Sequence, residues 1–318
     1  MTGSYSGSFF TDSEASGIRR FNVKVTLDCA HCLLERAVNQ ARLATDDLEL
    51  QMDVVSAMLD FLGKRFDADS VPSHIGTDRD LLVQRMTGRD PYEELKRQSN
   101  NMALSILPEL EKLVEEATDS KMRFRRATLI AAASNAIEFD VSGRDFSLEE
   151  LRHIIGKIES DLALDQIDEF MDLCLNANEV VYLTDNAGEV VLDMILISEI
   201  KRLGPKVLAV VKGGPVLNDA TMTDAMEVGL SERADDVMDT GAAAIGVNLE
   251  RNSEAFKEVL RSAELVIAKG MGNYESMTEF TALCPTVHIL RTKCLPVAQH
   301  LDCERNKNVI LIRYPDVD

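Results

Sequence analysis

Two polar turns carry the residues best suited to chemistry in this chain. The first turn reads Asp-Asn-Ala-Gly-Glu at Asp185–Glu189, and the second reads Asn-Asp-Ala-Thr at Asn218–Thr221, so Asp219 follows Asp185 by 34 positions. Carboxylate and amide oxygens from Asp185, Asn186 and Asp219 are hard ligands of the kind that hold a divalent cation such as Mg²⁺, Mn²⁺, Co²⁺ or Ni²⁺. A phosphate group readily displaces water from such a cation. The sequence therefore predicts a metal site that receives a phosphorylated compound.

The elements around these turns explain how the side chains could meet. Each turn follows a β-branched apolar run, residues 180–183 and residues 207–211, with a helical segment between them. Such a β-α-β unit makes its two strands parallel and brings both turns to one edge of the sheet. A simpler interpretation is that Asp185 or Asn186, and likewise Asp219, caps the helix that follows each turn.

A third strand adds positive charge at the same edge. The apolar run 265–268 ends in Lys269, Gly270 and then Asn273, and ligands of open α/β sheets bind beyond the carboxyl ends of the strands. An ammonium and a free glycine backbone suit phosphate oxygens, so we expect Lys269, Gly270 and Asn273 to bind substrate. The alternative for Lys269 is an ordinary solvated loop lysine.

The rhythm of apolar residues predicts two different regions. From residue 28 to residue 176 the spacing is helical, whereas short apolar strands alternate with helices from residue 179 onward. We expect a disordered N-terminus over residues 1–20, an α-helical domain over 21–177 and an α/β metal-binding catalytic domain over 178–318. The predicted fold is a Rossmann-like three-layer α/β/α core with a mostly parallel sheet. The expected strands are Glu179–Thr184, Lys206–Val211, Asp236–Asp239, Leu265–Ala268, Thr286–Leu290 and Asn308–Ile312.

Composition limits the classes of partner. The 318 residues are 45% hydrophobic and carry a formal net charge of −20, which argues against duplex nucleic acid or an anionic membrane as the main partner. The Ser- and Gly-rich residues 1–16 lack the apolar segment of a signal peptide. No apolar run approaches the about 18 residues of a membrane span. We expect a cytoplasmic protein, and the sequence does not specify its oligomeric state.

Six cysteines suggest a second kind of chemistry. Cys29 and Cys32 form a Cys-x-x-Cys pair, which can bind a metal or act as a dithiol, and Cys294 is a candidate third member of this thiol site. Buried cysteines that behave as small apolar residues are the plainer alternative.

Several motifs, in one order, give the chain its resemblance to a known family. Besides the two acidic turns, these are Lys-Gly with Asn-Tyr at Lys269–Tyr274 and Asp-Pro-Tyr at Asp90–Tyr92, followed by Lys96 and Ser99-Asn100. Together they resemble the metal-dependent damage-control phosphatases, long catalogued as a domain of unknown function. The similarity runs from about residue 22 to the C-terminus. The early cysteine pair, with Cys294, resembles one subgroup of that family.

The resemblance implies a fold, a reaction and a set of residues. Family members join a helical N-terminal region to a Rossmann-like core and hydrolyse phosphate esters of small metabolites with a divalent metal. The family's metal ligands fall on Asp185, Asn186 and Asp219, and its Lys-Gly motif falls on Lys269. A Gly-Asn pair of the family falls on Asn135, although this chain has Ser134 in place of the glycine and Glu138 where an aspartate is usual.

The principal hypothesis is a metal-dependent phosphatase that acts on a small phosphorylated metabolite, either a sugar phosphate or a damaged cofactor phosphate. Asp185 is a ligand that either attacks phosphorus itself or positions a water for attack. Glu189 either holds a metal-bound water near the substrate or stabilises the N-terminus of its helix. The alternatives are an S-adenosylmethionine-dependent methyltransferase and a thiol-based metal- or redox-responsive binding protein. The first of these lacks the glycine-rich loop expected after the first strand.

Overall fold

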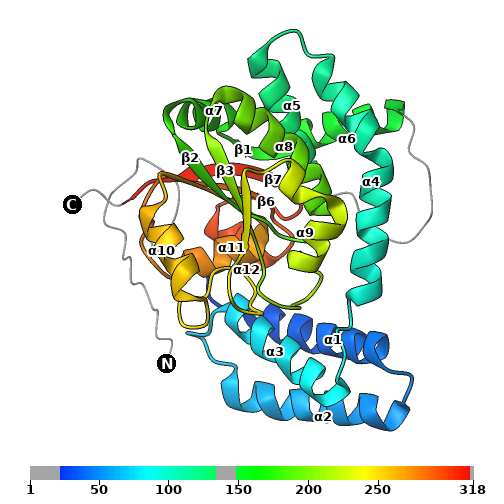
Figure 1. Ribbon diagram of the computed structural model, residues 1–318. Helices are drawn as coiled ribbons and strands as arrows, with labels where there is room; N and C mark the ends of the chain where they lie inside the picture. Colours follow the sequence, from blue (N-terminus) through cyan, green and yellow to red (C-terminus); the bar gives the residue numbers. More distant parts are fainter. Residues whose placement is uncertain (1–21, 134–147, 316–318) are drawn as a thin grey trace, which may run out of the picture.

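The computed structural model describes residues 22–133 and 148–315, which fold as an α/β structure (Figure 1). The expected disordered residues 1–20 and the site candidate Asn135 lie outside these ranges. The N-terminal helices are α1 (Leu27–Ala44), α2 (Leu48–Arg65), α3 (Pro72–Thr87), α4 (Glu93–Glu115), α5 (Ser120–Ala133), α6 (Leu148–Ser160) and α7 (Ile167–Asn176). The later helices are α8 (Glu189–Leu203), α9 (Met222–Val228), η1 (Leu230–Glu232), α10 (Glu254–Ser262), α11 (Gly270–Met277) and α12 (Leu295–His300).

The sheet has the order β1-β7-β6-β5-β2-β3-β4 within the described residues. Its strands are β1 (Leu162–Asp165), β2 (Glu179–Leu183), β3 (Lys206–Val211), β4 (Asp236–Asp239), β5 (Leu265–Lys269), β6 (Thr286–Arg291) and β7 (Asn308–Arg313). All neighbouring pairs are parallel except β6 and β7, which run antiparallel. The prediction of a mostly parallel α/β sheet is confirmed, and each of the six expected strands is present within one residue of its expected bounds.

One strand was not expected. β1 lies inside the stretch for which the sequence predicts only helices, and it pairs in parallel with β7 through Leu164 and Val309. Four residues whose burial alternates are too short a pattern to separate from the helices on either side. The sheet therefore draws on residues before 177, while the division of the chain into domains at that point stays a prediction.

Helices cover both faces of the sheet. One face packs against α4, α5, α6, α7, α8 and α9 through a large apolar core that includes Tyr182, Ile195 and Ile267. The other face packs against α10, α11 and α12 through two smaller clusters around Phe256 and Leu290. Because both faces are buried, the central strands are apolar along their whole length, as a parallel sheet requires.

The first three helices form a separate layer across the carboxyl ends of the strands (Figure 1). They have their own apolar core, which includes Val54, Met58 and Val83. Helix α3 binds two loops that leave the sheet, because Thr77 Oγ1 accepts a hydrogen bond from the Ile245 amide at 2.9 Å and the Asp80 carboxylate accepts one from the Leu217 amide. The helical layer is thus fixed directly onto the edge where the acidic turns lie.

Local signals in the sequence account for the helix ends. Asp47 caps α2 by accepting hydrogen bonds from the Glu49 and Leu50 amides, and Pro72 opens α3. Pro108 lies inside α4, which runs on past it as one helix. None of the helices in the described ranges has the length and apolar character needed to cross a membrane.

Gly246 provides a test of this packing. Its φ is +68°, and a Cβ there would lie 2.2 Å from the carbonyl oxygen of Gly272. Gly246→Ala combines overpacking, which costs about 1–3 kcal/mol, with a left-handed conformation, which costs about 1–2 kcal/mol. We expect the free energy of unfolding, measured by urea denaturation, to fall by about 2 kcal/mol or more.

Gly63 supplies the matched control. It lies in the exposed part of α2, with nothing within 4 Å of an added Cβ. Gly63→Ala should raise the free energy of unfolding by about 0.5–1 kcal/mol, because glycine is unfavourable inside a helix. Equal effects of the two substitutions would contradict the packing described around Gly246.

Candidate active site

The two acidic turns are joined to each other by backbone hydrogen bonds. Strands β2 and β3 pair in parallel up to Leu183 and Val210. Beyond them, the Ala220 amide donates to the Asp185 carbonyl at 2.7 Å and the Ala187 amide donates to the Asn218 carbonyl at 2.8 Å. A bridge between Asn186 and Asp219 completes this contact. The structure thus brings together the three residues predicted to hold a metal.

The topology of the sheet opens a crevice at this point. From β2 the chain continues to β3 and β4 on one side, and it later returns to β5 on the other side. Neighbouring connections that leave in opposite directions create the switch point at which ligands of open α/β sheets bind. The candidate site lies at the carboxyl ends of β2, β3 and β5, as the sequence predicts.

Burial and neighbouring negative charge make the ionised forms of Asp185 and Asp219 unfavourable. Burial raises the pKa of Asp185 well above its usual range, and the charges of Glu189 and Asp219 raise it further. Burial also raises the pKa of Asp219 to about 7, against the opposing charge of Lys212. Asp219 Oδ2 is buried without a hydrogen-bond partner. A divalent cation fits this set of oxygen atoms, because it would neutralise the carboxylates and fill the unused position on Asp219.

The fit depends on the Asn186 amide as well as on acidic groups. Within residues 22–133 and 148–315, no three His, Cys, Asp or Glu side chains are arranged so that they could hold a metal ion. The candidate set contains two carboxylates and one amide, which is a composition suited to a cation that keeps several waters.

Gly270 leaves room for the Asp185 carboxylate. It follows β5, has a φ of +80°, and a Cβ there would lie 1.9 Å from Asp185 Oδ2. A side chain at this position would displace the carboxylate, so the contact requires glycine. The predicted member Gly270 therefore belongs to the site, where it makes space for Asp185.

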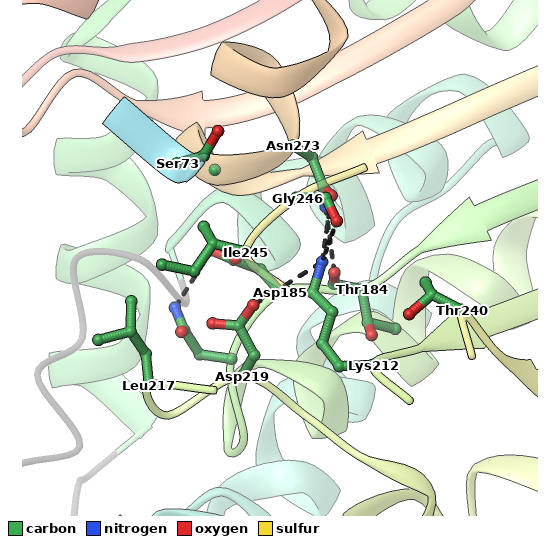
Figure 2. A network of polar contacts seen from close by, with 12 residues as sticks. Ser73, Thr184, Asp185, Lys212, Leu217, Asp219, Thr240, Ile245, Gly246 and Asn273 are labelled. Carbon is green, nitrogen blue, oxygen red and sulfur yellow. Dashed lines mark hydrogen bonds and ion pairs between the residues drawn. The ribbon is translucent and has the colours of Figure 1, made fainter. Parts of the chain in front are cut away.

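Lys212 is a site residue that the sequence analysis missed. It follows β3 directly and is 3% exposed, with Nζ 3.7 Å from Asp219 Oδ2 (Figure 2). The same ammonium donates to Asn273 Oδ1 at 3.2 Å and to the Gly246 carbonyl at 3.4 Å. The signal in the sequence is a lysine at the end of the strand next to β2, followed by Gly213 and Gly214. This pattern resembles the Lys-Gly pair after β5, which the sequence analysis assigned to the phosphate.

Lys269 lies elsewhere than expected. It is the last residue of β5, fully buried, and its Nζ donates to Asp193 of α8 and lies 3.9 Å from Glu189 Oε2. Burial raises the pKa of Asp193 to about 6, although Lys269 opposes the shift. The alternative of a solvated loop lysine is wrong, because Lys269 is fully buried on the α8 side of the sheet, near Glu189. A direct contact between Lys269 and substrate stays a prediction.

Asn273 and Glu189 have structural partners. Asn273 is buried on α11, where its Nδ2 donates to the Lys269 carbonyl at 2.7 Å and to the Thr184 carbonyl at 3.2 Å. Glu189 Oε1 accepts from Asn186 Nδ2 at 2.6 Å. Asn273 therefore positions Lys212, and Glu189 orients the amide of Asn186. Their predicted contacts with substrate stay predictions.

Helix α4 holds the acidic turns from the opposite side. Asn100 Oδ1 accepts from the Gly188 amide at 2.7 Å, and its Nδ2 donates to Asp224 Oδ1 at 3.0 Å. Lys96 Nζ lies 3.3 Å from Asp90 Oδ2 and 3.4 Å from Asp224 Oδ2. The motif residues quoted from the helical region thus bind the helices that begin after both turns.

The predicted thiol residues lie on two elements apart from the acidic turns. Cys29 and Cys32 lie on α1, and Cys294 precedes α12. A polar neighbour of Cys294 is Glu275 of α11, whose Oε1 lies 4.0 Å from Cys294 Sγ.

A cavity of about 510 Å³ lies apart from these residues, beside α10 and the segment after α11. Its lining includes Leu249, Leu260, Phe280 and Leu283. It contains none of the predicted catalytic residues, so we do not connect it with the chemistry of the acidic turns.

Comparisons with known proteins identify the relatives of the chain. Residues 25–309 match the family model of the damage-control phosphatase ARMT1-like domain. An uncharacterized protein of Methanocaldococcus jannaschii is 34% identical over 297 residues, covering 92% of this chain and 96% of that protein. A damage-control phosphatase of Archaeoglobus fulgidus is 33% identical over 281 residues, covering 88% and 96%.

A solved structure agrees with these matches. The crystal structure of a DUF89 family protein from Pyrococcus horikoshii superposes with a TM-score of 0.80 and 29% identity, covering 91% of this chain and 98% of that chain. The match spans both the helical layer and the sheet, and the family model includes both acidic turns. The chain therefore belongs to the damage-control phosphatase family with the ARMT1-like domain.

Proposed function

We propose that this protein is a divalent-metal-dependent phosphatase that hydrolyses the phosphate ester of a small metabolite, either a sugar phosphate or a damaged cofactor phosphate. Membership of a phosphatase family gives the reaction class. The observation that carries the proposal is the meeting of Asp185, Asn186 and Asp219 through the backbone contacts between their turns.

The donor set supports the choice of cofactor. Asp185, Asn186 and Asp219 would hold Mg²⁺, Mn²⁺, Co²⁺ or Ni²⁺, and the bound cation would supply the Lewis acidity that offsets charge on phosphoryl oxygens. The lack of a hydrogen-bond partner at Asp219 Oδ2 and the raised pKa of Asp185 are the features that a cation would relieve. Asn186 is held for this role by Glu189, to which it donates at 2.6 Å.

Positive charge for an anionic substrate comes from this chain's own lysines. The protein as a whole carries a formal charge of −20, so a phosphate must find local cations. Lys212 Nζ lies 3.7 Å from Asp219 Oδ2, beside the carboxylates, and is fixed by Asn273. Lysine is suited to phosphate as a compact point charge with three donors. Lys212 is therefore the residue that we assign to the phosphate, ahead of Lys269.

The helical layer and helix α4 supply the wall that faces the leaving group. Helices α3 and α4 both contact the loops of the site, α3 through Asp80 and Thr77 and α4 through Asn100. Groups presented from these helices select which ester fits, while the sheet edge provides the chemistry. This division agrees with a family in which one reaction serves small metabolites, and it disfavours the methyltransferase alternative.

Asp219→Asn tests the metal site. The substitution keeps the shape of the side chain but removes the negative charge, so we expect phosphate release to fall at least about 100-fold. Free phosphate should be measured with sugar phosphates, cofactor phosphates and an aryl phosphate, with Mg²⁺, Mn²⁺, Co²⁺ and Ni²⁺ in turn. The rise in Tm on adding the activating metal should also be lost.

The control for that experiment is Asp60→Asn, the same chemical change at an exposed position on α2. It should leave phosphate release and the metal-induced rise in Tm unchanged. Phosphate release by Asp219→Asn equal to that of the control would refute the assignment of the site.

Lys212→Met tests the phosphate contact. Methionine keeps the apolar stem of lysine and removes the charge, so we expect kcat/KM to fall by about 10²- to 10³-fold, as for loss of one preorganised donor. Lys257→Met on α10 is the matched control and should have no effect, because Lys257 pairs with Glu254 far from the acidic turns in sequence. An unchanged kcat/KM in Lys212→Met would return the phosphate contact to Lys269.

A further inference from the structure

Three thiols lie on two elements that are far apart in the sequence. Cys29 and Cys32 occupy the first two turns of α1, and Cys294 stands at the N-terminus of α12. Burial raises the pKa of Cys294 to about 12, and nearby Glu275, Cys29 and Cys32 raise it further. All three cysteines are free. The phosphatase chemistry proposed above uses none of them.

A buried carboxyl group lies beside Cys294. Glu275 lies on α11 with 8% exposure, and its Oε1 is 4.0 Å from Cys294 Sγ. Burial raises the pKa of Glu275 to about 7, against the charge of Arg36. The same helix begins at Gly270, against which the Asp185 carboxylate packs. Cys294 is therefore one short helix away from the acidic turns.

Cys32 is the thiol open to reaction. It is exposed, whereas Cys29 is half-buried, and Arg36 follows it by one turn of α1. Exposure gives an oxidant access to the sulfur of Cys32, and the thiolate is the nucleophilic form of cysteine. Cys29 Sγ accepts a hydrogen bond from the Thr26 amide at 3.4 Å, so the second thiol is held at the start of the helix.

The spacing of the pair suits a disulfide within one helix. Residues three apart on a helix have Cβ atoms about 5–6 Å apart, and a disulfide needs about 3.5–4.5 Å. The first turn of a helix can close that gap, since its amides have no partner inside the helix. A metal site is less well supported, because no three His, Cys, Asp or Glu side chains among the described residues could hold an ion as arranged.

We propose that Cys29 and Cys32 are a redox-active dithiol that low-molecular-weight disulfides convert reversibly to an intramolecular disulfide. The Cys32 thiolate attacks one sulfur of the oxidant, which forms a mixed disulfide and releases one thiol that takes up the Cys32 proton. The Cys29 thiolate then attacks Cys32 Sγ, and the second thiol of the oxidant leaves with the Cys29 proton. The protein loses two electrons and two protons, and the oxidant gains them.

This modification site lies on α1, in the helical layer that binds the loops of the sheet edge through α3. A change in phosphatase activity on oxidation would rest on the proposed function, whereas the thiol chemistry itself does not.

The experiment counts alkylatable thiols in the full-length protein. The reduced chain has six free cysteines, and after equilibration with excess glutathione disulfide we expect four, with recovery of six on adding dithiothreitol. Peptide mapping should locate the disulfide between Cys29 and Cys32. Cys32→Ser should prevent this disulfide. In that variant Cys29 can form only a mixed disulfide with glutathione.

Cys303→Ser is the matched control, because Cys303 is also partly exposed but lies outside the pair. This variant should still lose two thiols, from five to three, on oxidation. Because Cys32 is exposed, its replacement should leave the circular dichroism and Tm of the reduced protein unchanged. The readout does not depend on phosphatase activity, so the two proposals can fail separately.

Three results would overturn the proposal. One is the retention of six alkylatable thiols in excess glutathione disulfide. Another is a disulfide that joins Cys294 to either α1 thiol in place of the pair. The third is stoichiometric Zn²⁺ uptake that protects Cys29 and Cys32 from oxidation and is lost in Cys32→Ser, which would make the cluster a metal site.

Discussion

Asp185, Glu189 and Asp219 lie together in a region shielded from water, where the charge of Glu189 raises the pKa of both aspartates. Burial is the larger contribution, as the raised pKa values of Asp185 and Asp219 indicate. Such an arrangement is unfavourable unless the surrounding structure holds it in place or a bound cation neutralises it. Much of the nearby architecture is explained by this constraint. Gly270 gives the Asp185 carboxylate room, and Lys212 approaches Asp219 from the side.

The helical layer also helps to hold the acidic turns in place, through a contact from α3. Leu217, just before the second acidic turn, has a φ of +45°, an unfavourable value for a residue with a branched side chain. Its amide is held by Asp80, whose other oxygen accepts from Arg79 and Gln40. A buried carboxylate from α3 thus stabilises a strained loop on the sheet.

The sequence pattern predicts the strands and the acidic turns well, but it does not predict which lysine lies beside the carboxylates. The runs before Asp185 and Asp219 are long, apolar and β-branched, and the crossover rule then places both turns at one edge. β1 was not predicted, because four residues are too few to show the alternating pattern of a strand. The choice between Lys212 and Lys269 depends on which face of the sheet each residue meets. Lys269 shares a face with Leu265 and Ile267, which pack under α8, whereas Lys212 follows the last residue of its strand. The sequence shows which residues end a strand, but it does not show which helix covers each face of the sheet there.

The buried contact of Lys269 with Asp193 shows the role of a lysine on the α8 side of the sheet. Asp193 also accepts from the Tyr182 hydroxyl at 2.9 Å, yet burial still raises its pKa to about 6. A buried ion pair of this kind adds little to stability, because the attraction is offset by the loss of hydration. Its effect is positional: the Lys269 ammonium stays 3.9 Å from Glu189, which in turn holds the Asn186 amide at 2.6 Å. The ammonium thereby links the buried Asp193 carboxylate to the carboxylate that orients Asn186. An apolar residue at position 269 would leave Asp193 buried without its ion-pair partner and would remove the positive charge beside Glu189.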